Sequence, residues 1–535
     1  MLKLVLGASG SGKTTLLYAR IRARAETGKR SILLVPEQFT SSTEARIYRE
    51  LGDALSGMVE SYSFTSLAEH ILAALGGAAV QTLTDAGRAV LVRRALEELQ
   101  DNVHYYYRHR RSAAFCQMAA ETIDELKSAG LSGQQLQELA RDCGSESAKL
   151  GELALIFQGY ESLLAGTGMD PADRLELAAD RLEAALARDE LPDFLREREV
   201  FIDEFDTFNA PKKRLMGAML AALPAVTVAL CEDGAPMQPG DLELFSGAKQ
   251  VAAQLRQLAR KNGAQVAAPE LLRRDLRHKD APGLAALTEL LETGSCTPPE
   301  SAPELRLFAA ASREEEARCA AAAIRRLMRQ GVRCGKIAVV CRDISLYRAA
   351  VRYEFRMAEI PLYCDEPTTP EFSAPATAVR ALLALLRGAD MTEQLTVLAK
   401  TGLCDLTEPQ VCALENYAYT WSPNAAAWRA EFTKSPRGFG DAELTEEDTQ
   451  NLTRAENARK KLVMAVDTLR SKVRSANAEQ ISRALYFCLK ELGAEGQQAA
   501  QVEDIRTARG IPAAEEAARE WNVVMQLLDE MARLL

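Results

Sequence analysis

A glycine-rich loop near the start of the chain has the residue types and spacing of a phosphate-binding site. The apolar run Met1 to Leu6 predicts a short buried strand, and the pattern that follows the loop predicts a helix. Between them, backbone N–H groups can turn toward phosphate oxygens while the helix N-terminus adds a positive dipole. Lys13 would neutralise the β- and γ-phosphates of a nucleotide, and the Thr14 hydroxyl would bind Mg²⁺. The predicted nucleotide-binding residues are Gly7, Ala8, Ser9, Gly10, Ser11, Gly12, Lys13, Thr14 and Thr15.

Two acids directly follow a second apolar run. Val200 to Ile202 predicts a buried strand, after which come Asp203 and Glu204. Asp203 would hold Mg²⁺, and Glu204 would orient or deprotonate the attacking water. A strand that ends in a charged turn produces the same local pattern, but the phosphate loop upstream favours the chemical interpretation. Together the two motifs predict nucleotide hydrolysis rather than passive binding.

The composition is that of a multidomain globular chain. Its 535 residues, 47% of them apolar, exceed what one small core needs and exclude a disordered or fibrous class. A formal net charge of −10 argues against binding to nucleic acid by bulk charge, although it leaves room for a local basic groove. The 11 Cys include no C-x-x-C pair and the four His are dispersed, so no zinc site is expected. With neither a leader nor a membrane span in the pattern, a cytoplasmic protein is expected.

Four tracts resemble, in order and spacing, the first motifs of superfamily 1 helicases. They are GASGSGKTT (7–15), LLVPEQFT (33–40), ESYSFTSLA (60–68) and VFIDEFDTF (200–208). The detailed residue pattern of these tracts, together with CRD at 341–343 and KTGL at 400–403, is similar to that of the AddB family. Members of this family form one half of the bacterial AddAB helicase–nucleases. The resemblance covers essentially the whole chain.

This resemblance implies a fold and a set of site residues. The fold class is α/β, with RecA-like P-loop cores of the superfamily 1 type and large helical insertions. Lys13 and Thr14 would bind ATP and Mg²⁺, and Asp203 would complete the metal site beside the catalytic Glu204. Arg342 would reach the γ-phosphate from a second core, although an Arg just after a strand is often only solvated. Family members often lack the second acid, so Glu204 makes hydrolysis more plausible here than membership alone does.

Two groups of residues are candidates for DNA contact. By the resemblance, Gln38, Thr40, Ser63 and Phe64 line the path of a single strand, with an aromatic ring to stack a base. Loop capping and core packing explain these tracts equally well. Tyr106 and Arg108 lie in a tract that interleaves aromatic and basic residues, a composition that also suits a surface connection between helices. A basic run from Arg256 to Lys279 is expected to be a solvated helix face and linker.

The expected domains follow from these motifs and from the helical patterns between them. Residues 1–95 and 196–300 form the first RecA-like core, interrupted by a helical insertion over 96–195. A second core begins over 301–389, and a helical subdomain follows over 390–535, with Thr392, Thr407 and Thr445 at helix starts. The family's nuclease domain and iron–sulfur cluster are expected beyond Leu535, so none of the 11 Cys is assigned to a cluster.

Three functions are compatible with these observations. The preferred one is the ATP-binding, DNA-engaging, helicase-like part of a helicase–exonuclease subunit that processes double-strand breaks for recombinational repair. Its partners would be an AddA-type subunit and DNA, both single strands and duplex ends, with no membrane. The second is a DNA-scanning scaffold whose nucleotide site is inactive. The third, a phosphotransferase for a small molecule, is disfavoured by the helical insertion and the AddB-like tracts.

Overall fold

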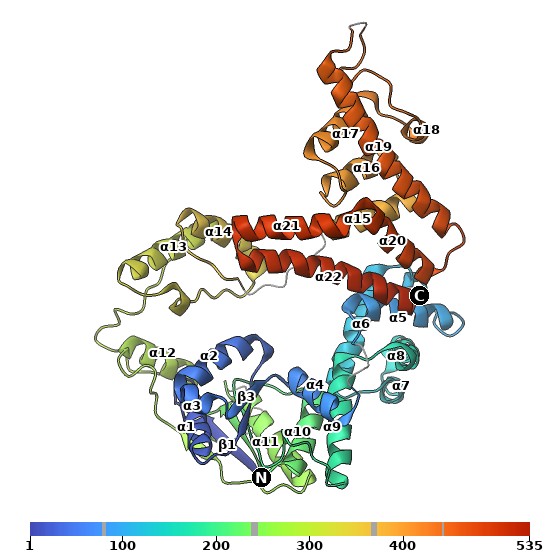
Figure 1. Ribbon diagram of the computed structural model, residues 1–535. Coiled ribbons are helices and arrows are strands. Elements are labelled where there is room, and N and C mark those ends of the chain that lie inside the picture. Colours follow the sequence, from blue (N-terminus) through green and yellow to red (C-terminus); the bar gives the residue numbers. More distant parts are fainter. Residues whose placement is uncertain (78–81, 237–243, 365–371, 441–442) are drawn as a thin grey trace. The chain divides into compact units, whose positions relative to one another are not determined.

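The computed structural model describes residues 1–77, 82–236, 244–364, 372–440 and 443–535 (Figure 1). The chain divides into two compact units. One contains Met1–Arg277 together with Ser373–Leu535, and the other contains His278–Phe372. No helix among the described residues is long and apolar enough to cross a membrane.

A six-stranded parallel sheet forms the centre of the first unit, which confirms the predicted α/β class. The strand order is β3-β2-β4-β5-β1-β6. Most of these strands are short, nearly continuous apolar runs, as expected where helices cover both faces of a sheet. The strands are β1 (Leu2–Gly7), β2 (Ser31–Leu34), β3 (Val59–Tyr62), β4 (Glu199–Ile202), β5 (Ala225–Cys231) and β6 (Glu270–Leu272).

Successive side chains of a strand pack into two different apolar layers, because they point to opposite faces of the sheet. Leu4 and Leu6 pack into one core, whereas Val5 between them packs into the other. The helices of the first layer are α4 (Phe64–Leu75), α9 (Pro171–Ala187), α10 (Ala210–Ala222) and α11 (Ser246–Lys261). Those of the second are α1 (Lys13–Glu26), α2 (Thr40–Leu51) and α3 (Asp53–Ser56).

The secondary-structure elements in the predicted helical insertion are helices. Its core is built by α5 (Asp85–Glu98), α6 (Ala113–Ser128), α7 (Gly133–Arg141) and α8 (Ser147–Thr167), so the helices begin upstream of residue 96. A buried carboxylate joins this core to α9: Asp170 accepts hydrogen bonds from Lys127 at 2.9 Å and from the Tyr160 hydroxyl at 2.6 Å. Such a fully paired charge is tolerated in an interior, whereas an unpaired one is not.

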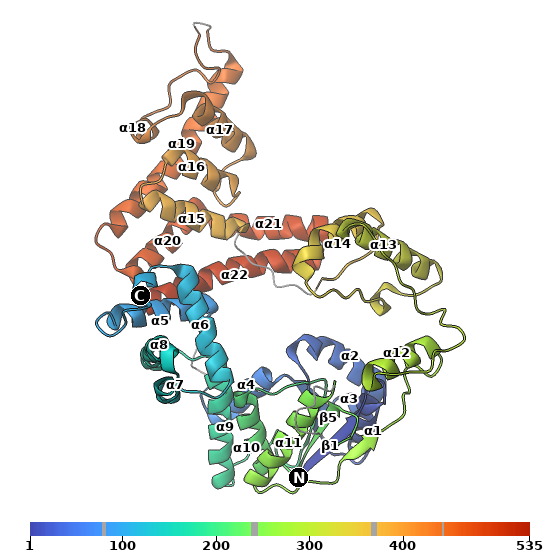
Figure 2. The same cartoon turned by 180° about the vertical axis from the view of Figure 1, so that it is seen from behind.

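The regular secondary structure of the described residues from 374 onward consists of helices. Thr407 and Thr445 cap helices, whereas Asp390 caps the helix in which Thr392 is the second residue. The last helix returns to α5, where Glu530 accepts hydrogen bonds from Thr84 and Leu534 joins the insertion core (Figures 1 and 2). The helices are α15 (Ala374–Leu386), α16 (Met391–Lys400), α17 (Glu408–Trp421), α18 (Ala425–Arg429), α19 (Glu446–Val473), α20 (Ala478–Leu492), α21 (Ala494–Arg509) and α22 (Ile511–Leu534).

The second unit consists of α12 (Pro282–Thr293), α13 (Arg313–Arg329) and α14 (Ile344–Met357). Helices α13 and α14 share a small core around Ala321, Ile324 and Phe355. Within the described residues of this unit no strand is formed. The sheet of a second RecA-like core therefore stays a prediction.

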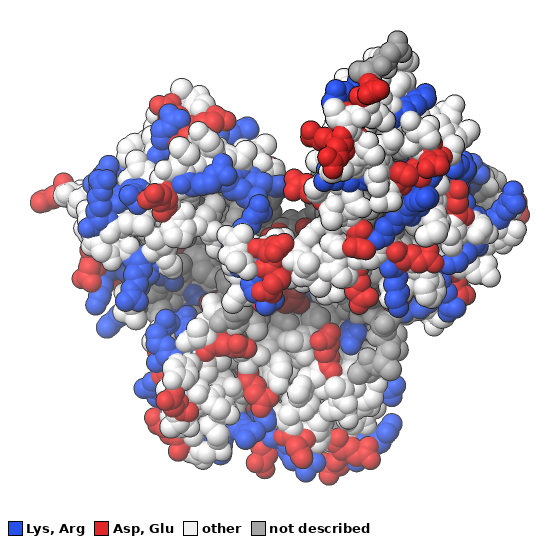
Figure 3. Space-filling model, turned by 45° about the horizontal axis from the view of Figure 1, so that its top comes forward, with Lys and Arg blue, Asp and Glu red and all other residues white. Residues whose placement is uncertain are grey.

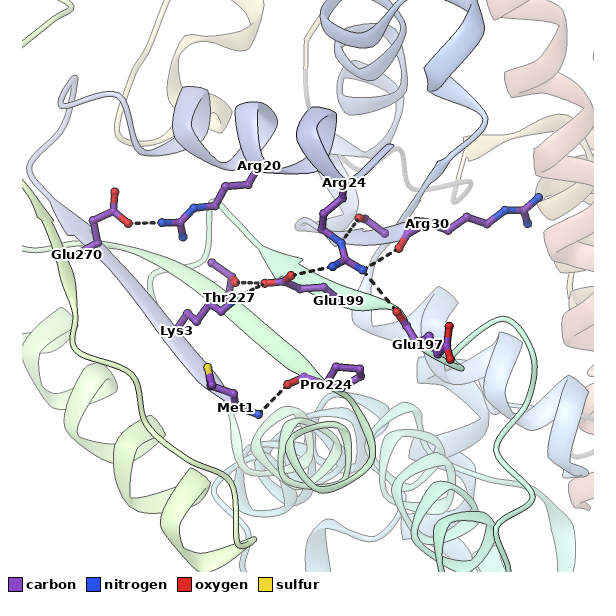
Figure 4. A network of polar contacts seen from close by, with 11 residues as sticks. Met1, Lys3, Arg20, Arg24, Arg30, Glu197, Glu199, Pro224, Thr227 and Glu270 are labelled. Carbon is purple, nitrogen blue, oxygen red and sulfur yellow. Dashed lines mark hydrogen bonds and ion pairs between the residues drawn. The ribbon is translucent and has the colours of Figure 1, made fainter. Parts of the chain in front are cut away.

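A buried carboxylate near the amino ends of the strands holds three of them and α1 together (Figure 4). Glu199 of β4 is 6% exposed and accepts hydrogen bonds from Lys3 and Thr227, each at 2.9 Å, while Arg24 lies 3.3 Å away. Removing one partner of a buried ion pair leaves the others uncompensated. This network is therefore expected to contribute to stability rather than to the chemistry of the loop.

We expect Glu199→Ala to lower the free energy of unfolding by about 2 kcal/mol, less than for a fully buried pair because Lys3 is partly exposed. Urea denaturation followed by circular dichroism measures the change. Nucleotide binding by the folded variant should be unchanged. A loss below about 0.5 kcal/mol, the size typical of surface substitutions, would contradict the role assigned to this carboxylate.

Candidate functional site

The glycine-rich loop lies between the strand and the helix predicted on either side of it. β1 ends at Gly7 and α1 begins at Lys13. Gly10 and Gly12 have φ angles of 80° and 93°, a conformation that side chains disfavour. The Lys13 ammonium donates to the carbonyls of Gly7 and Ala8 at 2.7 and 2.8 Å. The loop is thus curled around its own lysine, with α1 starting at its end.

A segment that the sequence assigned to a linker packs directly over this loop. The N–H of Leu276 donates to the Gly10 carbonyl at 3.0 Å, and the Arg277 guanidinium donates to the Ser9 hydroxyl at 3.2 Å. A Cβ on Gly10 would lie 2.8 Å from an Asp275 carboxylate oxygen, so the close approach needs glycine. The basic run from Arg256 to Lys279 is therefore not simply a solvated linker, because its end brings a guanidinium to the loop.

Asp203 and Glu204 lie at the carboxyl end of β4, as predicted. Asp203 is 6% exposed and accepts hydrogen bonds from Thr14 and, at 3.0 Å, from the backbone N–H of Glu204. Burial raises the pKa of Asp203, an effect opposed by the Thr14 hydrogen bond and the charge of Lys13. Desolvation and the charge of Asp203 likewise raise the pKa of Glu204. Glu204 has a φ of 65°, a left-handed backbone that is costly for a non-glycine residue and is often found at functional sites.

One pocket of about 440 Å³ brings the loop and both acids together. Arg46 of α2 and Arg277 also line it, and neither was predicted from the sequence as a site residue. A second pocket of about 600 Å³ shares Thr14, Arg46, Asp203, Glu204 and Asp206 with the first and extends to Gln38 and Phe39. The first pocket is lined by Ser9, Gly10, Gly12, Lys13, Thr14, Thr15, Arg46, Asp203, Glu204, Phe205, Asp206, Ala229, Cys231, Leu276 and Arg277.

The residues of this pocket fit a nucleotide with Mg²⁺. The Thr14 hydroxyl and the Asp203 carboxylate are oxygen ligands of the kind Mg²⁺ prefers, and they could hold it together with phosphate oxygens and water. Lys13, Arg46 and Arg277 supply positive charge around the same space. Among the described residues, the buried Ser11 hydroxyl at the loop has no hydrogen-bond partner.

The ionised form of Asp203 is expected to cost stability at neutral pH. Its pKa in the folded chain is raised above the usual 3.8, so its favourable contribution exists below that value and is lost as pH rises through the folded pKa. Asp203→Asn should therefore raise the free energy of unfolding at pH 7 by about 1 kcal/mol, a common trade-off at functional sites. Urea denaturation at pH 7 and at pH 4 checks this, since the gain should shrink at the lower pH. Exposed Asp206→Asn is the control, and an equal gain there would contradict the explanation.

The four residues predicted along a DNA path differ in accessibility. Gln38 is exposed in the short turn Glu37–Phe39 and lines the second pocket. Thr40 begins α2, and its hydroxyl donates to the Glu37 carbonyl at 2.9 Å. Ser63 caps α4, while Phe64 is 2% exposed and packs edge-on against Phe205 with centroids 5.2 Å apart. Ser63 and Phe64 thus have structural roles here, and their contact with DNA stays a prediction.

The aromatic and basic tract lies in the surface connection between α5 and α6. The Tyr106 ring is half-buried and stacks on Phe115 with centroids 5.4 Å apart, whereas Arg108 is exposed. The Glu152 carboxylate accepts the backbone N–H of Tyr106 at 3.1 Å and those of the two preceding residues. Arg108 is the more available of the two for a phosphate contact.

Arg342 belongs to the second unit. It is exposed and directly precedes Asp343, whose carboxylate caps α14 by accepting from the N–H of Ser345 at 2.9 Å. Its contact with a γ-phosphate stays a prediction. In the first unit, the Arg277 guanidinium contacts the loop.

Comparisons with known proteins show the family to which the chain belongs. The family model described as "ADDB, N-terminal" matches residues 4–288. A protein of Desulforudis audaxviator, named as a subunit of an ATP-dependent helicase/deoxyribonuclease, is 30% identical over all of this chain and 47% of its own length. Proteins of the same name from Moorella thermoacetica and Clostridium acetobutylicum are 30% and 24% identical, with the same coverage. The chain thus spans about half the length of these relatives. A chain that matches this model over more than half its residues, and its relatives from end to end, belongs to the AddB family.

Proposed function

We propose that this chain is the ATP-binding, DNA-engaging, helicase-like part of an AddB subunit. In this proposal it acts in the cytoplasm with an AddA-type subunit to process DNA double-strand breaks for recombinational repair. The observation that carries it is the pocket in which Lys13 and Thr14 face Asp203 and Glu204 across the ends of β1 and β4. The parallel sheet beneath that pocket supports a RecA-like P-loop core, because such folds bind nucleotides at the carboxyl ends of their strands.

Each of the main residues of the pocket would have its own role in hydrolysis. Lys13 would leave the loop carbonyls and neutralise the phosphates, while Thr14 and Asp203 hold Mg²⁺. Glu204 would accept a proton from water, helped by its raised pKa, which lies closer to neutral than that of an ordinary Glu. Arg277 would stabilise the charge that develops on the leaving phosphate.

The second unit offers a basic surface for DNA. Between Arg313 and Arg356 it has eleven Lys and Arg against five Asp and Glu, within a chain of net charge −10. Figure 3 shows positively charged side chains gathered over α13 and α14. Since phosphate neutralisation supplies most non-specific DNA affinity, this local charge supports binding that the total charge does not suggest.

ATP hydrolysis with and without single-stranded DNA tests the proposal. The purified chain is assayed alone and with an AddA-type partner, beside Lys13→Ala. DNA-stimulated turnover that Lys13→Ala abolishes would support it. Absence of both turnover and ATP binding in both series, with DNA still bound, would replace it by a DNA-scanning scaffold.

Replacing Arg326, Arg329 and Arg333 together by Gln is expected to weaken DNA binding in a salt-dependent way. These exposed residues lie on α13 and just after it. Three lost phosphate contacts should reduce the slope of log affinity against log salt by about 2 for a single strand. Fluorescence anisotropy from 50 to 200 mM salt measures it. A matched triple replacement of Arg22, Lys29 and Arg30, exposed on the first unit, should leave the slope unchanged. Equal slopes for the two variants would contradict the assignment.

A further inference from the structure

Arg46 lies where the two pockets of the first unit share a wall. Beside it, Thr14, Asp203, Glu204 and Asp206 belong to both pockets. The first pocket contains the phosphate loop, and the second contains Gln38 and Phe39 of the turn that leads into α2. A single side chain of α2 therefore faces both the predicted nucleotide site and the predicted DNA path.

Among the described residues, the guanidinium of Arg46 has no ion pair at contact distance, and its nearest partner is an aromatic ring. It lies over the Tyr18 ring at 4.9 Å from the centroid, and Tyr18 follows Thr14 by one turn of α1. Its charge lowers the pKa values of Asp203 and Glu204, against the desolvation that raises them. Its Nε is buried and, among the described residues, has no hydrogen-bond partner.

A bound nucleotide would offer the Arg46 guanidinium a more favourable hydrogen-bond partner. A buried N–H without an acceptor costs free energy that a phosphate oxygen would recover. Mg²⁺ bound at Asp203 would at the same time offset the carboxylate charge that faces Arg46. Arg46 lies in the second turn of α2, and α2 begins at Thr40, directly after the turn that contains Gln38. A shift of the Arg46 side chain would therefore be transmitted through α2 to that turn.

We propose that Arg46 is a positioning residue that couples nucleotide occupancy to the Glu37–Thr40 turn and hence to binding of single-stranded nucleic acid. With the pocket empty, Arg46 faces Asp203 and Glu204. With Mg²⁺ and a nucleoside triphosphate present, its guanidinium donates to a phosphate oxygen, and α2 and the turn before it are ordered. This inference rests on the proposed nucleotide and DNA binding, and it adds the residue that links them.

Two measurements on the purified chain test the coupling. The affinity for a fluorescein-labelled oligo-dT is measured with and without Mg²⁺ and the non-hydrolysable analogue AMP-PNP, and the affinity for AMP-PNP with and without oligo-dT. Hydrogen exchange of residues 36–51 is followed on adding Mg²⁺ and AMP-PNP alone. The variants are Arg46→Gln, Arg46→Lys and, as a matched control, Arg22→Gln, an exposed arginine of α1 outside both pockets.

We expect each ligand to change the affinity of the other at least about fivefold in the wild type and in Arg22→Gln, and less than about twofold in Arg46→Gln. In Arg46→Gln the affinity for oligo-dT alone should stay within about threefold, whereas that for AMP-PNP alone should fall about tenfold or more, because one charge-assisted hydrogen bond to phosphate is lost. Arg46→Lys should restore part of the coupling because it keeps the charge. Exchange over 36–51 should slow with AMP-PNP in the wild type and not in Arg46→Gln.

The outcomes separate this inference from the proposed function. Coupling that persists in Arg46→Gln would overturn the role of Arg46, as would a wild type that binds both ligands independently. A wild type that binds neither ligand would instead overturn the proposed function, and the inference with it.

Discussion

Replacing Glu204 by Gln is expected to lower kcat for ATP hydrolysis by about 10³-fold while ATP affinity changes less than about threefold. The carboxylate follows Asp203 at the end of β4, exposed to the pocket, and desolvation together with the charge of Asp203 raises its pKa. An amide keeps the shape and removes the base. The loss should therefore fall on turnover and not on binding.

The left-handed backbone at this position makes the choice of variant important. Glu204 has a φ of 65°, so a β-branched replacement would add strain to the loss of the base. Gln avoids that complication. The neighbouring Asp206, also in the pocket, offers Asp206→Asn as a control for a nearby lost charge. Single-turnover assays measure the chemical step, and equal losses in the two variants would mean that Glu204 is not the base.

The raised pKa also sets the expected pH dependence of the wild type. Glu204 acts as a base only when ionised, and Asp203 binds Mg²⁺ best when ionised. Because both pKa values are raised in the empty pocket, kcat/KM, which reports on the free protein, should fall at a higher pH on acidification than ordinary carboxylates would allow. In the Glu204→Gln variant this acid limb should reflect Asp203 alone.

Local patterns were sufficient to predict the elements around the pocket. The strand before the loop, the helix after it and the strand before the two acids each need only a short run of residue types. The meeting of Lys13 with Asp203 follows from parallel strands whose carboxyl ends share one edge. The residue types can be read from the sequence, whereas their meeting in one pocket depends on the order of the strands in the sheet.

Residues placed by long-range packing could not be predicted in the same way. Arg277 reaches Ser9 because β6 pairs with β1, and β6 has only three residues, too few to show a strand pattern. In the sequence, Arg46 is an ordinary residue of a helical pattern. Only the packing of α2 beside α1 places its guanidinium over the Tyr18 ring. Phe64 shows the opposite case, because motif resemblance identifies its position but not that its ring packs against Phe205.

Replacing Lys13 by Ala is expected to lower the affinity for ATP by about 10³-fold. Lys13 is the ammonium at the centre of the loop, held at 2.7 and 2.8 Å by two carbonyls that it would exchange for phosphate oxygens. Two charge-assisted hydrogen bonds lost at about 2 kcal/mol each give about 4 kcal/mol, which corresponds to that factor. Titration with a fluorescent ATP analogue measures it.

The fold should survive this substitution, because Lys13 begins α1 and Ala favours a helix. DNA affinity in the absence of nucleotide should therefore equal that of the wild type, and the circular dichroism spectrum should be unchanged. Exposed Lys29→Ala, just beyond the other end of α1, controls for the loss of one charge. If Lys13→Ala binds ATP as the wild type does, the glycine loop is a structural turn and the pocket does not hold phosphates. If it loses ATP and keeps DNA, the two binding sites are separate, which is the condition that coupling through Arg46 requires.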